Sequence, residues 1–208
     1  MSVKFHEAFS LDSARRQFNF SDHFLGDSLR DLWTSTGTGS AAVVDAQDGG
    51  VCRITTGATA TNIHRIDWGD IRSLHVSKQV TMEVRLKLEQ VTDIECRIYL
   101  WYDGGNLCGF KFDDSGDTNW EVVALNDAGA PVTDDSGITP DTNWHIFRIE
   151  CFPAGEVHYY IDGVECGNSP VTTEIPVDDY LEPYIIMTTE ENAAHYCDVD
   201  YVAIRQEI

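Results

Sequence analysis

Hydrophobic and polar residues alternate along several short stretches of the chain. In residues 80–88, "VTMEVRLKL", every second residue from Val80 to Leu88 is apolar and the residues between them are polar or charged. Residues 94–102, "IECRIYLWY", repeat the alternation, with Tyr99 and Trp101 on the polar side. Successive side chains of a β-strand point to opposite faces, so each stretch predicts a strand with one face in a core.

Residues 141–167, "DTNWHIFRIECFPAGEVHYYIDGVECG", predict how such strands are connected. Alternation over residues 145–151 is interrupted at Pro153 and resumes over residues 157–161. The pair Asp162-Gly163 follows, and it suits a tight turn because glycine, and less readily aspartate, tolerates positive φ. The stretch therefore predicts an antiparallel meander of strand, turn, strand, turn and short strand.

The rest of the chain predicts more strands and almost no helix. Further strand segments are residues 41–46, 51–55, 107–112, 120–125, 183–189 and 196–205, separated by turn sequences such as 48–50, 102–106, 113–117 and 126–131. Many short strands at regular spacing predict an all-β fold, a sandwich of two antiparallel sheets. At 208 residues, one such domain uses nearly the whole chain and needs no disulfide or metal to hold its core together.

The first twenty residues differ from the rest. We assign residues 1–20 to an N-terminal arm and residues 21–208 to the sandwich domain. Ser10 is placed to cap a short helix over residues 11–18. The arm carries basic residues on an otherwise acidic chain: Lys4, Arg15 and Arg16. The sequence leaves two interpretations of the arm open: it docks to a partner, or it packs on its own sandwich.

The charge balance excludes several classes of partner. The chain has 35 acidic and 14 basic residues, which gives a net charge of −21. Such a charge repels nucleic acid and anionic lipid, so neither nucleic acid nor a membrane surface is expected as a partner. No apolar run has transmembrane length, and the N-terminus carries no hydrophobic segment of signal-peptide type. We therefore expect a soluble protein that is not exported by the ordinary route.

The cysteines favour core positions over a disulfide framework. Cys96 and Cys151 lie on the apolar side of their strands, where thiols act as small core residues. Three others lie near turns, where the sequence leaves their pairing open: Cys52, Cys108 and Cys166. Without an export signal, reduced thiols are the default expectation. No Cys-x-x-Cys unit is present, which argues against a structural zinc site.

Three stretches in order carry a resemblance to a known superfamily. They are "DHFLGDSLRDLWTSTGTGSAAV" at residues 22–43, "DTNWHIFRIE" with "VHYYIDGV" in the middle, and "CDVDYVAIR" at residues 197–205. Over about residues 21–206 the chain resembles concanavalin A-like, laminin-G-like jelly-roll domains, most of all those of tailed-bacteriophage structural proteins. This resemblance implies a jelly roll with the middle stretches in its framework. It does not choose a function, because the superfamily includes lectins, hydrolases, lyases and structural modules.

The catalytic motifs of related enzymes are absent. Hydrolases of this superfamily carry Glu-x-Asp-x-x-Glu on one strand, and the sequence contains no Glu-x-Asp. Neither a Gln-x-His strand nor a Tyr-x-Lys strand of the alginate-lyase type is present. The nearest carboxylate pair on one strand, Asp198 and Asp200, is attributed to the surface. These absences predict a protein without enzymatic activity.

A glycan-binding face is the better-supported site. Arg97, Tyr99 and Trp101 lie on the polar side of their strand, and His158 and Tyr160 lie on the polar side of theirs. If the two strands share a sheet, these side chains line its outer, concave face, where aromatic rings stack on sugars and polar groups bind hydroxyls. The alternative is that loops cover this face and bury the aromatic residues.

One acidic loop is a weak candidate for calcium. Asp113, Asp114 and Asp117 lie within "FDDSGD", and calcium prefers several oxygen ligands from such a loop. The spacing is not that of an EF-hand, and acidic turns are common in so negative a chain. No other cofactor is expected.

These observations predict a non-enzymatic virion structural or decoration protein of a phage. Its expected partners are capsid or tail proteins, surface glycans, or both, and it is expected to form a symmetric homo-oligomer. The expected location is the virion, after synthesis in the host cytoplasm without a signal peptide. The alternative is a carbohydrate-binding module or a polysaccharide-cleaving enzyme, a hydrolase or lyase, on the same fold.

Overall fold

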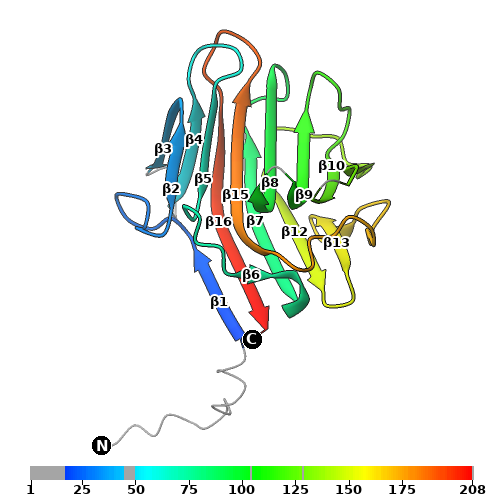
Figure 1. The fold of residues 1–208 in the computed structure, drawn as a ribbon. Helices are drawn as coiled ribbons and strands as arrows, with labels where there is room; N and C mark the ends of the chain where they lie inside the picture. Colours follow the sequence, from blue (N-terminus) through cyan, green and yellow to red (C-terminus); the bar gives the residue numbers. More distant parts are fainter. Residues whose placement is uncertain (1–16, 45–49, 104, 128, 208) are drawn as a thin grey trace, which may run out of the picture.

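The chain folds as a sandwich of two antiparallel sheets with eight strands each (Figure 1). The structure is a computed structural model, and it describes residues 17–44, 50–103, 105–127 and 129–207. The expected all-β jelly-roll sandwich is thereby confirmed. Within the described residues, no helix has the length and apolar character needed to cross a membrane.

Each sheet mixes strands from distant parts of the sequence. Sheet A runs from edge to edge through β14 (Val164–Glu165), β13 (Glu156–Ile161), β12 (His145–Phe152), β7 (Val80–Leu88), β16 (Tyr196–Glu207), β4 (Val51–Thr56) and β3 (Gly39–Val44), with β1 (Gln17–Asp22) also paired to β16. Sheet B runs through β11 (Val132–Asp135), β10 (Glu121–Asn126), β9 (Asn106–Asp113), β8 (Ile94–Asp103), β15 (Tyr180–Thr189), β5 (Ile63–Asp67) and β2 (Thr34–Gly37), with β6 (Leu74–His75) also paired to β15. A short 3-10 helix, Val76–Lys78, leads from β6 to β7.

The alternating stretches form strands where the pattern predicts them. Along β7, buried and half-buried residues alternate without a break from Val80 to Leu88. The predicted meander is β12, β13 and β14, and its last turn has Asp162 at φ 52° and Gly163 at φ 76°. Both values lie in the left-handed region that Asp-Gly tolerates, so the turn is the tight hairpin expected from that pair.

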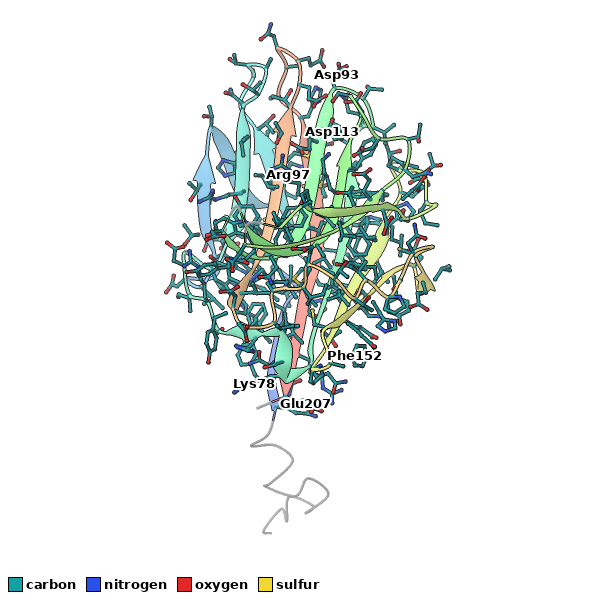
Figure 2. The ribbon with its side chains drawn as sticks, turned by 45° about the vertical axis from the view of Figure 1, so that its right-hand side comes forward. Lys78, Asp93, Arg97, Asp113, Phe152 and Glu207 are labelled. Carbon is teal, nitrogen blue, oxygen red and sulfur yellow. The ribbon has the colours of Figure 1, made fainter. Side chains whose placement is uncertain are left out.

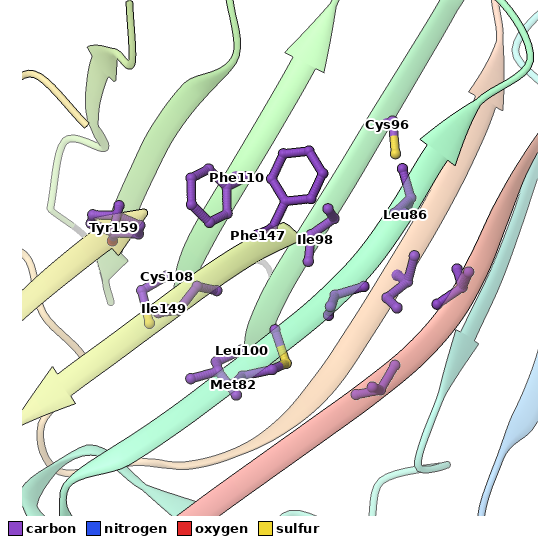
Figure 3. Packing of buried hydrophobic residues seen from close by; sticks show 14 of the residues in the cluster. Met82, Leu86, Cys96, Ile98, Leu100, Cys108, Phe110, Phe147, Ile149 and Tyr159 are labelled. Atoms are coloured by element: carbon purple, nitrogen blue, oxygen red, sulfur yellow. The ribbon is translucent and has the colours of Figure 1, made fainter. Parts of the chain in front are cut away.

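Aromatic side chains fill one end of the space between the sheets (Figure 3). The ring centroids of Trp120 and Phe147 are 4.6 Å apart, and those of Phe110 and Phe147 are 5.3 Å apart. Tyr159 from sheet A lies beside Phe110, and its hydroxyl donates to the carbonyl of Val123 in sheet B at 3.0 Å. This bond gives the buried Tyr159 hydroxyl a partner in a region that water does not reach.

The N-terminal arm is shorter than expected. Gln17–Asp22 forms β1, so residues 17 and 18 lie in a strand and the predicted helix is wrong at its end. The reason is packing, because Phe18 and Phe20 contact Trp68, at centroid distances of 6.3 and 5.1 Å. The rest of the arm, including Ser10 and the three basic residues, lies outside the described residues.

All six cysteines are buried as thiols. Cys52 and Cys108 lie inside strands β4 and β9 rather than beside exposed turns, and Cys108 Sγ is 3.9 Å from Cys151 Sγ. Burial raises the pKa of Cys52 and of Cys166 to about 12. Because the thiolate is the nucleophile, neither side chain is suited to nucleophilic chemistry at neutral pH.

The bond between Tyr159 and Val123 predicts a measurable contribution to stability. Tyr159→Phe removes a buried hydroxyl and its hydrogen bond to the Val123 carbonyl, so the free energy of unfolding should fall by about 1 kcal/mol. Tyr160→Phe, one residue along on the outer face, should change it by less than about 0.5 kcal/mol. Urea denaturation of both variants measures the difference. Equal effects would show that the buried hydroxyl contributes nothing specific.

Candidate functional site

The predicted glycan-binding residues lie on two different faces of the molecule. Arg97, Tyr99 and Trp101 come from β8 in sheet B, whereas His158 and Tyr160 come from β13 in sheet A. The expectation that all five line one concave face is therefore wrong. Alternation identifies which face of a strand is polar, but it does not identify the sheet to which that strand belongs.

Three aromatic residues form a platform on the outer face of sheet B: Tyr99, Trp101 and Tyr184. The rings of Trp101 and Tyr184 stack at a centroid distance of 4.7 Å and an angle of 27°, and Tyr99 is the direct neighbour of Tyr184 across β8 and β15. The two tyrosines are 6% and 7% exposed, while Trp101 is only half-buried. Trp101 is thus the part of the platform that can contact a ligand.

A polar pocket of about 310 Å³ opens beside Trp101. We call it the Trp101 pocket, and its lining residues are Thr34, Thr36, Arg65, Asp67, Gly69, Asp70, Trp101 and Glu182. They come from β2, β5, β8 and β15 and from the turn after β5, because these four strands are neighbours in sheet B. The pocket combines one aromatic wall with hydroxyl, carboxylate and guanidinium groups, a combination that suits a polar ligand with apolar faces.

Two carboxylates from neighbouring strands meet in this pocket. Asp67 on β5 accepts hydrogen bonds from Arg65 Nε and from the Gly69 amide, both at 2.8 Å. Glu182 on β15 uses Oε2 to accept from the amides of Trp68 and Asp70, at 3.0 and 3.2 Å. Its other oxygen, Oε1, makes only a long approach to Arg72 Nε at 3.9 Å.

The two carboxylates differ in protonation chemistry. Burial raises the pKa of Glu182, the negative charge of Asp67 raises it further, and the hydrogen bond from the Trp68 amide opposes the rise. Asp67 forms an ion pair with Arg65, and Arg65 also donates to the Tyr184 hydroxyl at 3.0 Å. A carboxyl group biased toward its neutral form beside an ion-paired carboxylate is the division of roles that acid–base catalysis uses.

The far half of this face carries more ion pairs (Figure 2). Arg97, labelled midway along the sandwich, pairs with Glu95 at 2.5 Å. Lys111 on the next strand lies 3.5 Å from both Asp113 and Asp117. The cations of this face are therefore already neutralised by carboxylates of the same chain.

The calcium candidates use their oxygens within the loop. Asp113 accepts from the amide and hydroxyl of Ser115, and Asp114 accepts from the amides of Asp93 and Ile94. In the part of the chain that the structure describes, no group of three or more His, Cys, Asp or Glu is arranged to hold a metal ion. Calcium at Asp113, Asp114 and Asp117 stays a prediction.

On the outer face of sheet A, the other predicted residues contact one another. His158 Nδ1 lies 2.7 Å from Glu165, and the guanidinium of Arg148 lies 4.2 Å from the centroid of the Tyr160 ring. The carboxylate of Asp198 accepts both Arg53 Nε and Nη2, at 2.7 and 3.0 Å, and Asp200 is paired with Arg85. These side chains form a network of ion pairs and stacked groups rather than a pocket.

Sequence analysis missed Asp67, Tyr184 and Glu182 as site residues. Residues 63–67, "IHRID", have apolar residues on both faces, so the alternation that would have predicted β5 is blurred. Glu182 precedes Pro183, and a proline weakens the prediction of a strand. Only the pairing of β15 with both β5 and β8 brings the three residues together.

Comparison with known proteins gives the fold a context. No protein-family model and no curated protein sequence matches the chain. Among solved structures, it is similar to a β-1,3-glucanase from Mycobacterium marinum, with a TM-score of 0.66, 14% identity, and coverage of 89% of this chain and 97% of that chain. An endo-β-1,3-glucanase from Pyrococcus furiosus has a TM-score of 0.66 at 15% identity and covers 91% of this chain and 94% of its own. A glycoside hydrolase family 16 endo-glucanase from Bacteroides ovatus, in complex with G4G3G-2F-DNP, has a TM-score of 0.67 at 12% identity, with coverage of 89% and 99%.

These structures correct the functional prediction. They support the jelly-roll resemblance, but they show no link to a phage, and their fold is that of glucan-cleaving enzymes. The prediction of a virion structural or decoration protein without enzymatic activity is therefore wrong. The motif Glu-x-Asp-x-x-Glu belongs to a single strand, whereas neighbouring strands also bring carboxylates together, as they do with Asp67 and Glu182. At this level of identity the likeness establishes the fold, and the activity is argued from the site.

A carboxyl group at the far end of the same face predicts a pH dependence of stability. Burial and the neighbouring Asp113 and Asp114 raise the pKa of Glu190 to about 7, from an ordinary value of 4.5. Between these two values the folded state holds a proton that the unfolded state releases, so stability should fall as pH rises from about 4.5 to about 7.

Glu190→Gln removes this titration. The variant should match the wild type near pH 4 and have a higher Tm above pH 7, measured by thermal melts across that range. Glu207→Gln, a substitution in an exposed carboxylate on the other sheet, should leave the pH profile unchanged. A Glu190→Gln profile parallel to that of the wild type would contradict the interpretation.

Proposed function

We propose that the chain binds an uncharged polysaccharide on the outer face of sheet B and hydrolyses it in the Trp101 pocket. The observation that carries the proposal is the meeting of Glu182 and Asp67 beside the half-exposed ring of Trp101. The similarity in fold to β-1,3-glucanases makes a β-glucan the first substrate to test.

The binding half of the proposal depends on the platform and its polar surroundings. The face of a sugar ring formed by C–H groups packs against Trp101, while hydroxyls bond to Thr34, Thr36 and Arg65. An uncharged chain is favoured because the net charge of −21 repels polyanions and because Arg65 and Arg97 are already paired.

Each of the two carboxyl groups has its own role in the proposed hydrolysis. Glu182, whose pKa is raised by burial, donates a proton from Oε1 to the glycosidic oxygen as the C–O bond breaks. Asp67 accepts a proton from the water that attacks the anomeric carbon, so the products are two sugar chains with a new reducing end. Arg65 positions Asp67 through the bond between Nε and Oδ2.

Removing the proton donor tests the catalytic half. Glu182→Gln keeps an oxygen that can accept from the Trp68 and Asp70 amides, so the fold and binding should survive. The release of reducing ends from β-1,3-glucan or mixed-linkage glucan should fall by about 100-fold or more. Glu121→Gln, a half-buried carboxylate on the same face, should keep full activity.

The outcomes of this experiment separate cleavage from binding. Full activity in Glu182→Gln would remove Glu182 from the mechanism. A wild-type chain that binds glucan but releases no reducing ends across the panel would overturn the hydrolase assignment.

Removing the aromatic wall tests the binding half. Trp101→Ala should weaken binding to a soluble glucan oligosaccharide by about tenfold or more, because about 1.4 kcal/mol of stacking corresponds to that ratio. Trp144→Ala, on the outer face of sheet A beneath Arg85, should leave that affinity unchanged. Isothermal titration calorimetry measures both. Equal affinities in the two variants would show that the Trp101 pocket is not the binding site.

A further inference from the structure

A second hollow lies on the outer face of sheet A, on the opposite side of the sandwich from the Trp101 pocket. Its volume is about 380 Å³, and it lies near the C-terminal end of β16, where Glu207 is labelled in Figure 2. Its lining residues are Asn19, Phe20, Ser21, Thr81, Glu83, Ala203, Ile204 and Arg205. We call it the Ala203 hollow.

The register of three strands creates this hollow. One row across β1, β16 and β7 is Ser21, Ala203 and Glu83, and the row before it is Asn19, Arg205 and Thr81. Ser21 and Ala203 are small, so they leave a depression between larger neighbours. All three are strands of sheet A, with β16 between β1 and β7, which makes the depression a feature of the sheet rather than of a loop.

Arg205 is distinctive among the arginines that the structure describes. Each of the others forms an ion pair with an Asp or Glu: Arg30, Arg53, Arg65, Arg72, Arg85, Arg97 and Arg148. Within the described residues, Arg205 has no carboxylate within 4.0 Å and its side chain is exposed at the edge of the hollow. Among the described residues, no carboxylate holds the guanidinium of Arg205, so it can donate hydrogen bonds to a ligand.

The other side of the hollow offers an acceptor. Glu83 Oε1 accepts from the Tyr201 hydroxyl at 2.6 Å, which fixes the carboxylate in place at the wall. The side chains of Asn19, Ser21 and Thr81 make no hydrogen bond within the described part of the chain. The floor between these groups is the methyl group of Ala203.

This arrangement selects a class of ligand. A carboxylate ligand would be attracted by Arg205 but repelled by the negative charge of Glu83. A cationic ligand would be attracted by Glu83 but repelled by Arg205. A neutral polyol satisfies both, because each hydroxyl donates and accepts, and its C–H groups can rest on the Ala203 methyl. We infer that the Ala203 hollow binds a sugar unit of the polysaccharide, as a second contact remote from the carboxylates of the Trp101 pocket.

The identity of the polysaccharide rests on the proposed function, but the position of the site does not. The two sites lie on opposite faces, so a short oligosaccharide cannot occupy both at once. A long or insoluble polymer presents many chains and can engage both faces, which raises the effective concentration at the second site. The hollow should therefore matter for binding to polymer and not for turnover of short substrates.

Filling the hollow tests the inference. Ala203→Trp should lower the affinity for insoluble β-1,3-glucan by about tenfold, measured by depletion from solution, and should leave kcat/KM for a soluble tetrasaccharide unchanged. Ala42→Trp places the same side chain at an exposed position of β3 in the same sheet, away from the hollow, and should change neither value. Arg205→Gln should lower the affinity for the polymer in the same direction without filling the space.

The outcomes distinguish this inference from the proposed function. Unchanged affinity for the polymer in both Ala203→Trp and Arg205→Gln, with normal turnover, would overturn the second site and leave the hydrolase standing. Binding of polymer that persists in Trp101→Ala and is lost on adding Ala203→Trp, with no cleavage in any variant, would support the second site and reject the hydrolase. A wild-type chain that binds no polymer would overturn both.

Discussion

The packing of two sheets against each other decides where every other feature of this protein can lie. Each long strand gives one of its two faces to the space between the sheets, and the aromatic group of Trp120, Phe147, Phe110 and Tyr159 fills part of that space. The Tyr159 hydroxyl bonds across it to the opposite sheet. Side chains that meet ligands are therefore restricted to the two outer faces and the loops, and the two outer faces point in opposite directions. A chain built this way can hold two sites that do not interfere, but it cannot join residues of both faces into one site.

Charged side chains on the two outer faces are partly buried, and ion pairs or hydrogen bonds must offset the cost of that burial. Asp198, at 3% exposure, is held by two bonds from Arg53, and Asp67, at 4%, accepts from Arg65 and from the Gly69 amide. These partners are needed because an unpaired buried charge is far more costly than a paired one. Glu182 differs, since among the described residues its hydrogen bonds come from two backbone amides, both to the same oxygen, and its ion pair with Arg72 is long, at 3.9 Å. Its burial is therefore accompanied by a raised pKa, which is why this carboxyl group, and not Asp198, suits proton transfer.

Much of the fold follows from the sequence, and the site does not. Alternation predicted β7 with its bounds and the turn at Asp162-Gly163, because both depend on residues close in sequence. It placed Trp101 and Tyr160 on the polar sides of their strands, which is correct, but the two share a face only if their strands share a sheet, and they do not. Periodicity could not decide this, since the pairing of β8 with β15 and of β13 with β12 depends on contacts between distant segments.

The same limit explains why the resemblance to phage proteins misled. The stretches that carry it, among them "DTNWHIFRIE" and "VHYYIDGV", become β12 and β13, which are framework strands of sheet A. Core packing and the hairpin turn constrain the residues of these two strands. Any jelly roll with this hairpin therefore needs similar residue types at these positions, whatever it binds. The residues that can separate one function from another lie on the outer face of sheet B, where Asp67, Trp101 and Glu182 come from three strands that no short motif spans. Because neighbouring strands bring these side chains together, a motif search along single strands can neither establish a catalytic pair here nor exclude one.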